Sequence, residues 1–188
     1  MTKSRCPWNA RDELLIRYHD EEWGVTVHDD RTHFEFLTLD GFQAGLSWSI
    51  VLKKRENFRD AFDGFDPEII ARYSDHKLEE LAQNAGIIRN RMKIKATVKN
   101  AKVFLNIQKE FGSFDTFIWD VNGPALMNQF ESLSEIPAST TVSDRMSKEL
   151  KQRGFSFVGT TICYAYMQSA GMVNDHIVSC FRYKECLV

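Results

Sequence analysis

Apolar residues recur at three- and four-residue spacing along almost the whole chain, whereas the period-two alternation typical of strands is hard to find. The pattern predicts an all-α protein. A first helix should follow Asn9 and run to about His19, and a second should open at Asp30 as its N-cap, followed by a loop that holds Gly41 and Gly45. A third helical face is traced by Trp48, Val51, Leu52, Phe58 and Phe62.

The middle of the chain carries three further helix signals. Asp66-Pro67 predicts the N-cap and first residue of a fourth helix, and Ser74 caps a short fifth helix that Gly86 ends. A long helix is expected from about Asn90 to Phe111, closed by Gly112. Its lysines should line the side opposite a buried stripe formed by Ile94, Val98, Ala101 and Leu105.

The last third of the chain predicts two helices joined by a short turn. A polar, proline-containing stretch from residue 122 to 141 precedes a helix that Ser143 caps and Gly154 ends. Another helix is expected from Thr160 to Ala170, with Gly171 at its end. The long connection leaves room for a two-lobed helical bundle whose chain ends return to each other, within a single domain spanning residues 1–188.

The composition indicates a packed soluble domain. The chain has 188 residues, 43% of them hydrophobic and 27% charged, which is near the globular average and enough for a sizeable core. No apolar run approaches the roughly 18 residues needed to cross a bilayer. Four unevenly spaced cysteines suit a reducing cytosol better than a disulfide scaffold. We therefore expect a cytoplasmic monomer without a membrane partner.

The net charge of -2 hides an uneven distribution. Residues 1–40 carry five basic and nine acidic side chains, whereas residues 87–109 carry seven basic side chains and no acidic one. The seven are Arg89, Arg91, Lys93, Lys95, Lys99, Lys102 and Lys109. Such a face of one sign can hold a local anion site, or it can be the solvated side of a helix.

Glycines bracket the turn between the last two predicted helices, in the segment 154–161. Glycine permits a sharp turn and a close approach by another chain, and the free N–H groups at the start of the following helix can receive a phosphate. The segment can therefore grip a DNA backbone without reading its sequence, or it can be an ordinary corner between two helices.

Metal-ligating residues stand at both ends of the chain, Cys6 and His19 near the start and His176 and Cys180 near the end. His176 and Cys180 are four residues apart, so on a helix they would project from one face and could hold one tetrahedral ion. The four residues would make a closed zinc site that ties the termini together, with no position for substrate. The alternative is a set of isolated buried cysteines and surface histidines.

A third group of residues is aromatic and acidic, and consists of Trp8, Tyr18, Trp23, Trp48 and Asp40. Trp and Tyr beside a carboxylate form a pocket that can stack on a flat ring, attract positive charge and accept hydrogen bonds from an amino group. A cationic or N-alkylated nucleobase fits that description. The alternative is that the aromatic residues fill the core and Asp40 caps a turn.

Several segments carry a family resemblance in their order and spacing. They are Cys6-Pro7-Trp8, residues 18–25 (YHDEEWGV), residues 43–48 (QAGLSW) with 51–56 (VLKKRE), residues 85–89 (AGIIR), residues 157–163 (FVGTTIC) and residues 173–176 (VNDH). From about Cys6 to Cys180 the chain resembles the 3-methyladenine DNA glycosylase I family.

The resemblance implies a helix-hairpin-helix DNA glycosylase of base excision repair, with the hairpin element at about residues 144–170. It implies one structural zinc held by Cys6, His19, His176 and Cys180, and a base pocket formed by Trp8, Tyr18, Trp23, Asp40 and Trp48. Asp40 would be the catalytic carboxylate that contacts the base. DNA contacts are implied for a loop that enters the gap left by the extruded nucleotide and for the hairpin, through Gly45, Leu46, Gly154, Phe157, Gly159, Thr160 and Thr161.

The implied reaction removes 3-methyladenine from alkylated double-stranded DNA, releasing the free base and leaving an abasic site without strand cleavage. The base must first be extruded from the duplex. Because the alkylated base is positively charged and leaves neutral, no general acid is needed. Asn174 stands where other helix-hairpin-helix glycosylases place a catalytic aspartate, and the neighbouring Asp175 is not assigned that role.

Three departures from the family pattern affect the activity and specificity that the resemblance implies. Asp40 replaces a glutamate, Leu15 replaces a second pocket tyrosine, and Phe42 replaces a polar residue. A shorter carboxylate keeps its charge but can miss a hydrogen bond to the base, at a cost of about 1 to 3 kcal/mol. The alternative function is a catalytically impaired or altered-specificity paralogue that binds damaged DNA without efficient base release.

Overall fold

The computed structural model describes residues 3–9 and 12–186, most of which lie in α-helices. The helices are α1 (Glu13–Glu21), α2 (Asp30–Gln43), α3 (Trp48–Lys53), α4 (Arg55–Ala61), α5 (Pro67–Ile70), α6 (Asp75–Gln83), α7 (Arg91–Phe111), α8 (Phe114–Asn122), α9 (Thr141–Arg153), α10 (Thr160–Ser169) and α11 (Phe181–Glu185). Short 3-10 helices are η1 (Pro7–Asn9), η2 (Asp63–Phe65) and η3 (Leu133–Glu135). Two parallel strands, β1 (Leu126–Met127) and β2 (Val173–Asn174), were not predicted. The helical fold class is confirmed.

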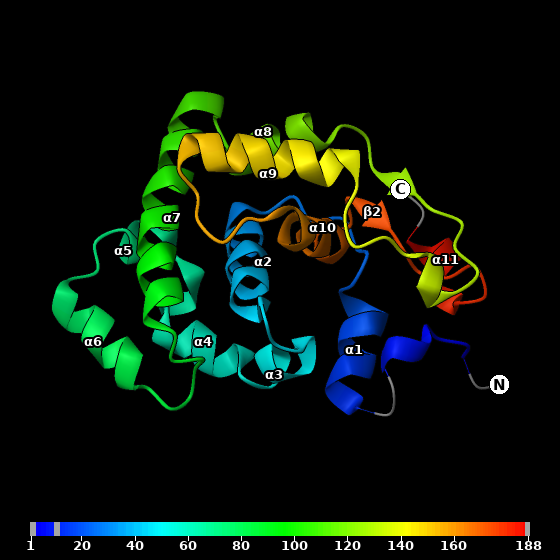
Figure 1. The fold of residues 1–188 in the computed structure, drawn as a ribbon, viewed down its shortest axis with the longest axis horizontal. Coiled ribbons are helices and arrows are strands. Elements are labelled where there is room, and N and C mark those ends of the chain that lie inside the picture. The colour runs from blue at the N-terminus through cyan, green and yellow to red at the C-terminus, as the bar shows by residue number, and fades with distance from the viewer. Residues whose placement is uncertain (1–2, 10–11, 187–188) are drawn as a thin grey trace.

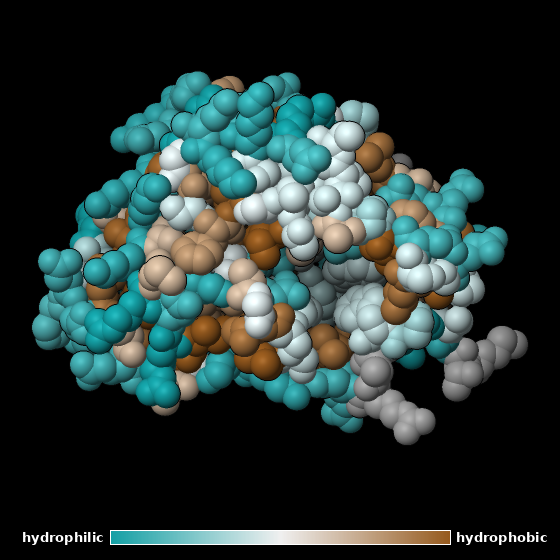
Figure 2. Space-filling view, viewed as in Figure 1, coloured by the Kyte–Doolittle hydropathy of each residue, from teal (hydrophilic) through white to brown (hydrophobic). Residues whose placement is uncertain are grey.

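Helix α2 lies between two groups of helices (Figure 1). Helices α4 to α7 gather on one side, and α1, α11 and the two chain ends lie on the other. The space-filling view from the same direction shows a hollow between the positions that α1, α3 and α10 occupy in Figure 1 (Figure 2). Among the described residues, no helix is both long and apolar enough to span a bilayer.

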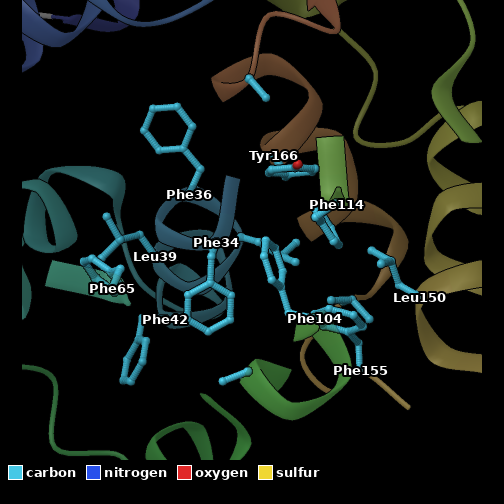
Figure 3. Packing of buried hydrophobic residues seen from close by; sticks show 14 of the residues in the cluster. Phe34, Phe36, Leu39, Phe42, Phe65, Phe104, Phe114, Leu150, Phe155 and Tyr166 are labelled. Atoms are coloured by element: carbon cyan, nitrogen blue, oxygen red, sulfur yellow. The ribbon is translucent and has the colours of Figure 1, made fainter. Parts of the chain in front are cut away.

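Helix α2 is buried on almost every side, and every residue from 33 to 42 is buried. Its Phe34 packs edge to face against Phe104 of α7, at 5.1 Å between ring centroids, and Phe104 stacks on Phe114 of α8 at 4.2 Å (Figure 3). This aromatic core fixes the position of α2. It therefore also fixes Asp40, which lies one turn before the end of that helix.

The first two helices begin at residues other than those predicted. Asp12 caps α1, its carboxylate accepting a hydrogen bond from the N–H of Leu14 at 3.1 Å, so the helix does not follow Asn9 directly. Asp29 caps α2, and Asp30 is the first helical residue. The carboxylate of Asp30 instead accepts two backbone N–H groups at the start of α8, a helix that the hydrophobic pattern did not reveal.

Three other local predictions are wrong. The expected third helix breaks at Lys54 into α3 and α4, and the Lys54 ammonium donates to two backbone carbonyls in the segment before α7. Thr140 caps α9, while Ser143 is the third residue of a capping box and bonds back to the cap. Gly41 lies inside α2 and not in the loop that follows it.

Helix α7 has the predicted bounds, with Asn90 as its N-cap, but its buried face differs. Leu105 is only half-buried, and Phe104 and Ile107 take its place in the core. Lys93 was expected on the solvated side. It is instead 7% exposed and donates to the carbonyls of two residues at the end of α2, because those terminal carbonyls lack helical partners.

Candidate functional site

A cavity of about 210 Å³ opens among α1, α2, α3 and α10. It is lined by Trp8, Tyr18, Trp23, Asp40, Gln43, Trp48, Ile136, Ala165, Gln168 and Ser169. The five residues that the sequence suggested for a base pocket all belong to this set. The structure therefore gathers them around one cavity, and Asp40 lies inside α2 and does not cap a turn.

Aromatic rings form much of the cavity wall. Trp8 and Trp23 meet edge to face at 5.0 Å between ring centroids, and Tyr18 and Trp48 lie 5.2 Å apart with their planes inclined by 51°. Such pairs are favourable and hold each other in place. The cavity therefore offers fixed π surfaces on which a flat or positively charged ring can stack.

Asp40 is 1% exposed, and its Oδ2 has no hydrogen-bond partner among the described residues. Burial raises the pKa of its carboxyl well above its usual range, and the Ser169 hydroxyl and the Arg55 guanidinium offset this only in part. The indole N–H groups of Trp8 and Trp48 are also buried without partners in the part of the chain that the structure describes. Because buried polar atoms are normally paired, three such atoms around one cavity mark a site that a polar ligand completes.

The nearby positive charge of Arg55 is already paired. Its Nε donates to Glu35 at 2.5 Å and its Nη1 donates to Glu22 at 2.5 Å. Two carboxylates thus surround one guanidinium, and together they raise the pKa of Arg55 despite its burial. Because Arg55 is already engaged by these two carboxylates, it offsets the effect of burial on Asp40 only in part.

Sequence reasoning missed five lining residues: Gln43, Ile136, Ala165, Gln168 and Ser169. Gln43 lies three residues after Asp40, on the same face of α2. The same spacing places three residues on one face of α10: Ala165, Gln168 and Ser169. Once one lining residue of a helix was known, helical spacing could therefore have identified the others on that helix. Ile136 lies in the irregular connection before α9, where no periodicity indicates burial.

The four candidate metal ligands at the chain ends do meet. One ligand atom from each of Cys6, His19, His176 and Cys180 can be chosen so that all four lie within 4.8 Å of one another, and all four residues are buried. The Cys180 Sγ lies 3.4 Å from His19 Nε2 and 3.5 Å from His176 Nδ1. Contact with Cys6, and then with the two imidazoles, lowers the pKa of Cys180, which favours the thiolate that binds metals.

The outward nitrogens of both imidazoles are held by hydrogen bonds. His19 Nδ1 lies 2.8 Å from an oxygen of Asp20, a carboxylate that Arg5 clamps, and His176 Nε2 lies 2.9 Å from the Trp23 carbonyl oxygen. Such partners fix the tautomer and direct the lone pair of the other nitrogen toward the cluster. Two thiols and two oriented imidazoles are the donor set that a tetrahedral metal takes, so the residues present fit a metal ion.

The helical argument for His176 and Cys180 is wrong, although the pair does converge. Both residues precede α11, in an irregular segment between β2 and that helix. The amide of Asn174 orders this segment by accepting from the His176 N–H at 3.1 Å and donating to the Tyr183 carbonyl at 2.9 Å. Asn174 therefore positions a candidate metal ligand.

The segment between α9 and α10 makes a tight hairpin. Gly154 ends α9 with a φ of 106°, and Phe157 adopts a φ of 58°, a left-handed conformation that is strained for a residue with a side chain. The side chain of Asn100 from α7 holds Ser156 through two hydrogen bonds with its backbone, at 2.8 and 3.0 Å. Helix α7 thus holds the loop that leads to the N-terminus of α10, which begins after Gly159.

The loop between α2 and α3 projects from the same end of α2 as Asp40. Gly45 adopts a φ of 83°, and Leu46 is 40% exposed.

Two residues expected to alter the pocket lie elsewhere. Phe42 points into the core against Phe58, at 4.7 Å between ring centroids, and Leu15 packs beside the aromatic cluster without lining the cavity.

The chain is similar to known proteins over almost its whole length. The profile of the family described as methyladenine glycosylase matches residues 8–183. DNA-3-methyladenine glycosylase 1 of Escherichia coli (strain K12) is 51% identical over 95% of this chain and 96% of that protein. The corresponding protein of Haemophilus influenzae is 47% identical over 94% of this chain and 96% of its own length.

Solved structures agree with these matches. A crystal structure of 3-methyladenine DNA glycosylase I superposes with a TM-score of 0.91 at 51% identity, covering 95% of this chain and 98% of the other. A structure of the Staphylococcus aureus enzyme, which addresses 3-methyladenine recognition, gives a TM-score of 0.90 at 32% identity over 94% and 95% of the two chains. The resemblance inferred from the sequence is confirmed, and the chain belongs to the methyladenine glycosylase family.

Proposed function

We propose that the protein is a monofunctional DNA glycosylase that hydrolyses the bond between 3-methyladenine and deoxyribose in alkylated duplex DNA. It releases the free base and leaves an abasic site without cutting the strand. The names of its relatives support the substrate, since they are called 3-methyladenine glycosylases. The observation that carries the proposal is the cavity in which a buried, unpaired carboxyl oxygen of Asp40 lies among aromatic rings.

The cavity suits a cationic purine better than a neutral one. Methylation at N3 puts positive charge on adenine, which the π faces and Asp40 attract. A bound cation lowers the pKa of Asp40 again, because it favours the ionised carboxylate. The indole N–H groups of Trp8 and Trp48 supply donors for ring nitrogens that carry lone pairs.

Charge on the base also explains why little acid catalysis is needed. When the C1′–N9 bond breaks, its electron pair moves to the base, which leaves as neutral 3-methyladenine. Water then attacks C1′ and loses a proton. No lysine lines the cavity within the described residues, which supports water and not an amine as the nucleophile. Asp40 and the DNA phosphates stabilise the positive charge that moves to the sugar.

Two surfaces would hold the DNA while the base is extruded. The N–H groups at the start of α10, beside Lys148 and Lys151, suit a phosphate. The residues expected to contact DNA here lie in or next to the turn between α9 and α10, and they are Gly154, Phe157, Gly159, Thr160 and Thr161. The exposed Leu46, with Gly45 before it, would enter the space that the extruded base leaves.

One structural zinc would be held by Cys6, His19, His176 and Cys180. With four protein ligands the site has no open position, so the ion would tie the chain ends together and activate no water. Its effect on the reaction would be indirect. Trp23 lines the cavity and its carbonyl accepts from His176, so the metal ligands support one wall of the pocket.

The test is release of methylated bases from alkylated duplex DNA, with Asp40→Ala and Trp48→Ala as controls. We expect the wild-type chain to release 3-methyladenine and both variants to lose most of that activity. Failure of the folded, metal-loaded protein to release any methylated purine would contradict the enzymatic proposal. Duplex affinity without base release would select the alternative of an impaired paralogue. Of the three departures that motivated that alternative, only Asp40 lines the cavity.

A further inference from the structure

The carboxylate of Asp175 plays no part in the proposed reaction, yet it is 1% exposed and accepts three hydrogen bonds. The Tyr164 hydroxyl and the Gln168 Nε2 donate to its Oδ2 at 2.6 and 2.7 Å. The Asn128 Nδ2 donates to its Oδ1 at 2.6 Å. Tyr164 is itself only 2% exposed, so this network is anchored in the interior.

The network fixes which way the Gln168 amide faces. A carboxylate surrounded by three donors offers only acceptors, so the amide nitrogen of Gln168 must face Asp175 and its oxygen must face away. Gln168 also lines the cavity, together with Ala165 and Ser169 on the same face of α10. Within the described ranges, no protein group donates to the Gln168 Oε1.

Among the described residues, the cavity then holds one buried acceptor without a donor, the Asp40 Oδ2, and two unpaired indole donors. The half-buried Gln168 lines the same cavity, and its Oε1 is a second acceptor that receives no hydrogen bond from those residues. An exocyclic amino group on a purine supplies two N–H groups, whereas a carbonyl at the same position supplies only an acceptor. A carbonyl facing Gln168 would leave its Oε1 without a donor, and this lowers the affinity because the bound base excludes water from that oxygen.

We infer that Gln168 is a specificity-determining residue, oriented by Asp175 to accept a hydrogen bond from the exocyclic amino group of the bound base. The inference rests on the proposed function and extends it to the choice between purines. Asp175 is a positioning residue, since it acts through the amide of Gln168 and does not line the cavity.

The test compares two free bases, 3-methyladenine and 3-methylhypoxanthine, in which a carbonyl replaces the amino group. Calorimetric titration of the metal-loaded chain gives the ratio of their dissociation constants. Gln168→Met keeps the length of the side chain but removes its acceptor, so we expect the preference for 3-methyladenine to fall about tenfold. Gln83→Met, at an exposed position of α6, is the matched control and should keep the wild-type ratio.

Asp175→Asn separates positioning from a purely structural role. An asparagine there offers both a donor and an acceptor, so the Gln168 amide is free to turn over and we expect the preference to fall as in Gln168→Met. A structural role alone would weaken binding of both bases equally and leave the ratio unchanged. Because His176 follows directly, the metal content of this variant must match that of the wild type.

Failures of the two proposals are distinguishable. If the wild-type chain binds and releases 3-methyladenine while Gln168→Met keeps the wild-type ratio, the inference about Gln168 is wrong and the proposed function stands. If Gln168→Met loses the preference and Asp175→Asn keeps it, the positioning role is wrong. A wild-type chain that neither binds nor releases 3-methyladenine contradicts the proposed function itself.

Discussion

Replacement of Asp40 by asparagine should stabilise the free protein while abolishing its proposed activity. The carboxyl is almost completely buried, and one of its oxygens has no partner within the described residues. Burial therefore raises its pKa in the folded state above the value in the unfolded chain. Asn has nearly the same size and shape but carries no charge at any pH.

The sign and size of the effect follow from linkage. A group whose pKa is raised by folding contributes its stability fully below its unfolded pKa, and that stability is lost as the pH rises through the folded pKa. Keeping one buried group unpaired costs about 1 to 3 kcal/mol. We expect Asp40→Asn to raise the free energy of unfolding at pH 8 by roughly 1 to 2 kcal/mol, which corresponds to a Tm increase of about 2 to 8 °C for a chain of this size. At pH 4 the gain should be much smaller, since the wild-type carboxyl is then protonated.

Thermal and urea unfolding of the metal-loaded protein between pH 4 and pH 8 would measure this dependence. Asp120→Asn, at an exposed position near the end of α8, is the matched control and should change the Tm little at either pH. The reasoning is refuted if Asp40→Asn is no more stable than the wild type at pH 8, or if its gain is the same at both pH values. Loss of base release in the stabilised variant would show that the carboxylate is kept for function at the expense of stability.

Three other changes test separate parts of the structure. Cys180→Ser should lose the one zinc expected per chain together with folding stability, and an undiminished zinc content by atomic emission would refute the ligand set. Lys93→Met leaves two carbonyls at the end of α2 without their donor, so it should lower the free energy of unfolding measured in urea by about 2 kcal/mol. Lys99→Met, at an exposed position of α7, is the control and should change that free energy by less than about 0.5 kcal/mol. Gly171→Ala would place a Cβ 2.4 Å from the backbone nitrogen of Thr26, so it should lower the Tm. Gly112 also has a positive φ but has open space where a Cβ would lie, so Gly112→Ala should lower the Tm far less. Equal effects of the two substitutions would contradict the packing argument.

Local signals in the sequence predicted the helices well where a single residue determines the boundary. Asp66 caps α5 with Pro67 as its first residue, and Asn90 and Gly112 bound α7, all as expected. The errors arise where a residue serves a distant element. Asp30 was available as a cap for α2, but its carboxylate holds the start of α8, more than eighty residues away. Periodicity does not report such long-range bonds.

The candidate site was predictable to a similar extent. The residue types alone left a pocket and a filled core as alternatives, and the family resemblance implied the pocket. The structure brings Trp8, Tyr18, Trp23, Asp40 and Trp48 to one cavity. The role that we infer for Gln168 could not be predicted from the sequence, because it depends on a hydrogen bond to Asp175 across the turn that ends α10. Phe42 was expected in a loop near the pocket, but α2 continues as far as Gln43. The helical position of Phe42 directs its side chain into the core.

The cluster of candidate metal ligands lies against one wall of the cavity. Neighbouring residues of α1 face different sites, since Tyr18 lines the cavity and His19 joins the cluster. The Trp8 ring packs edge to face on His19 at 5.4 Å between centroids. Isolated helices as short as α1 are marginal in water, and chain ends fray unless they are held. The aromatic wall therefore depends on contacts at the cluster, so a metal ion bound there would stabilise the cavity without touching a molecule inside it.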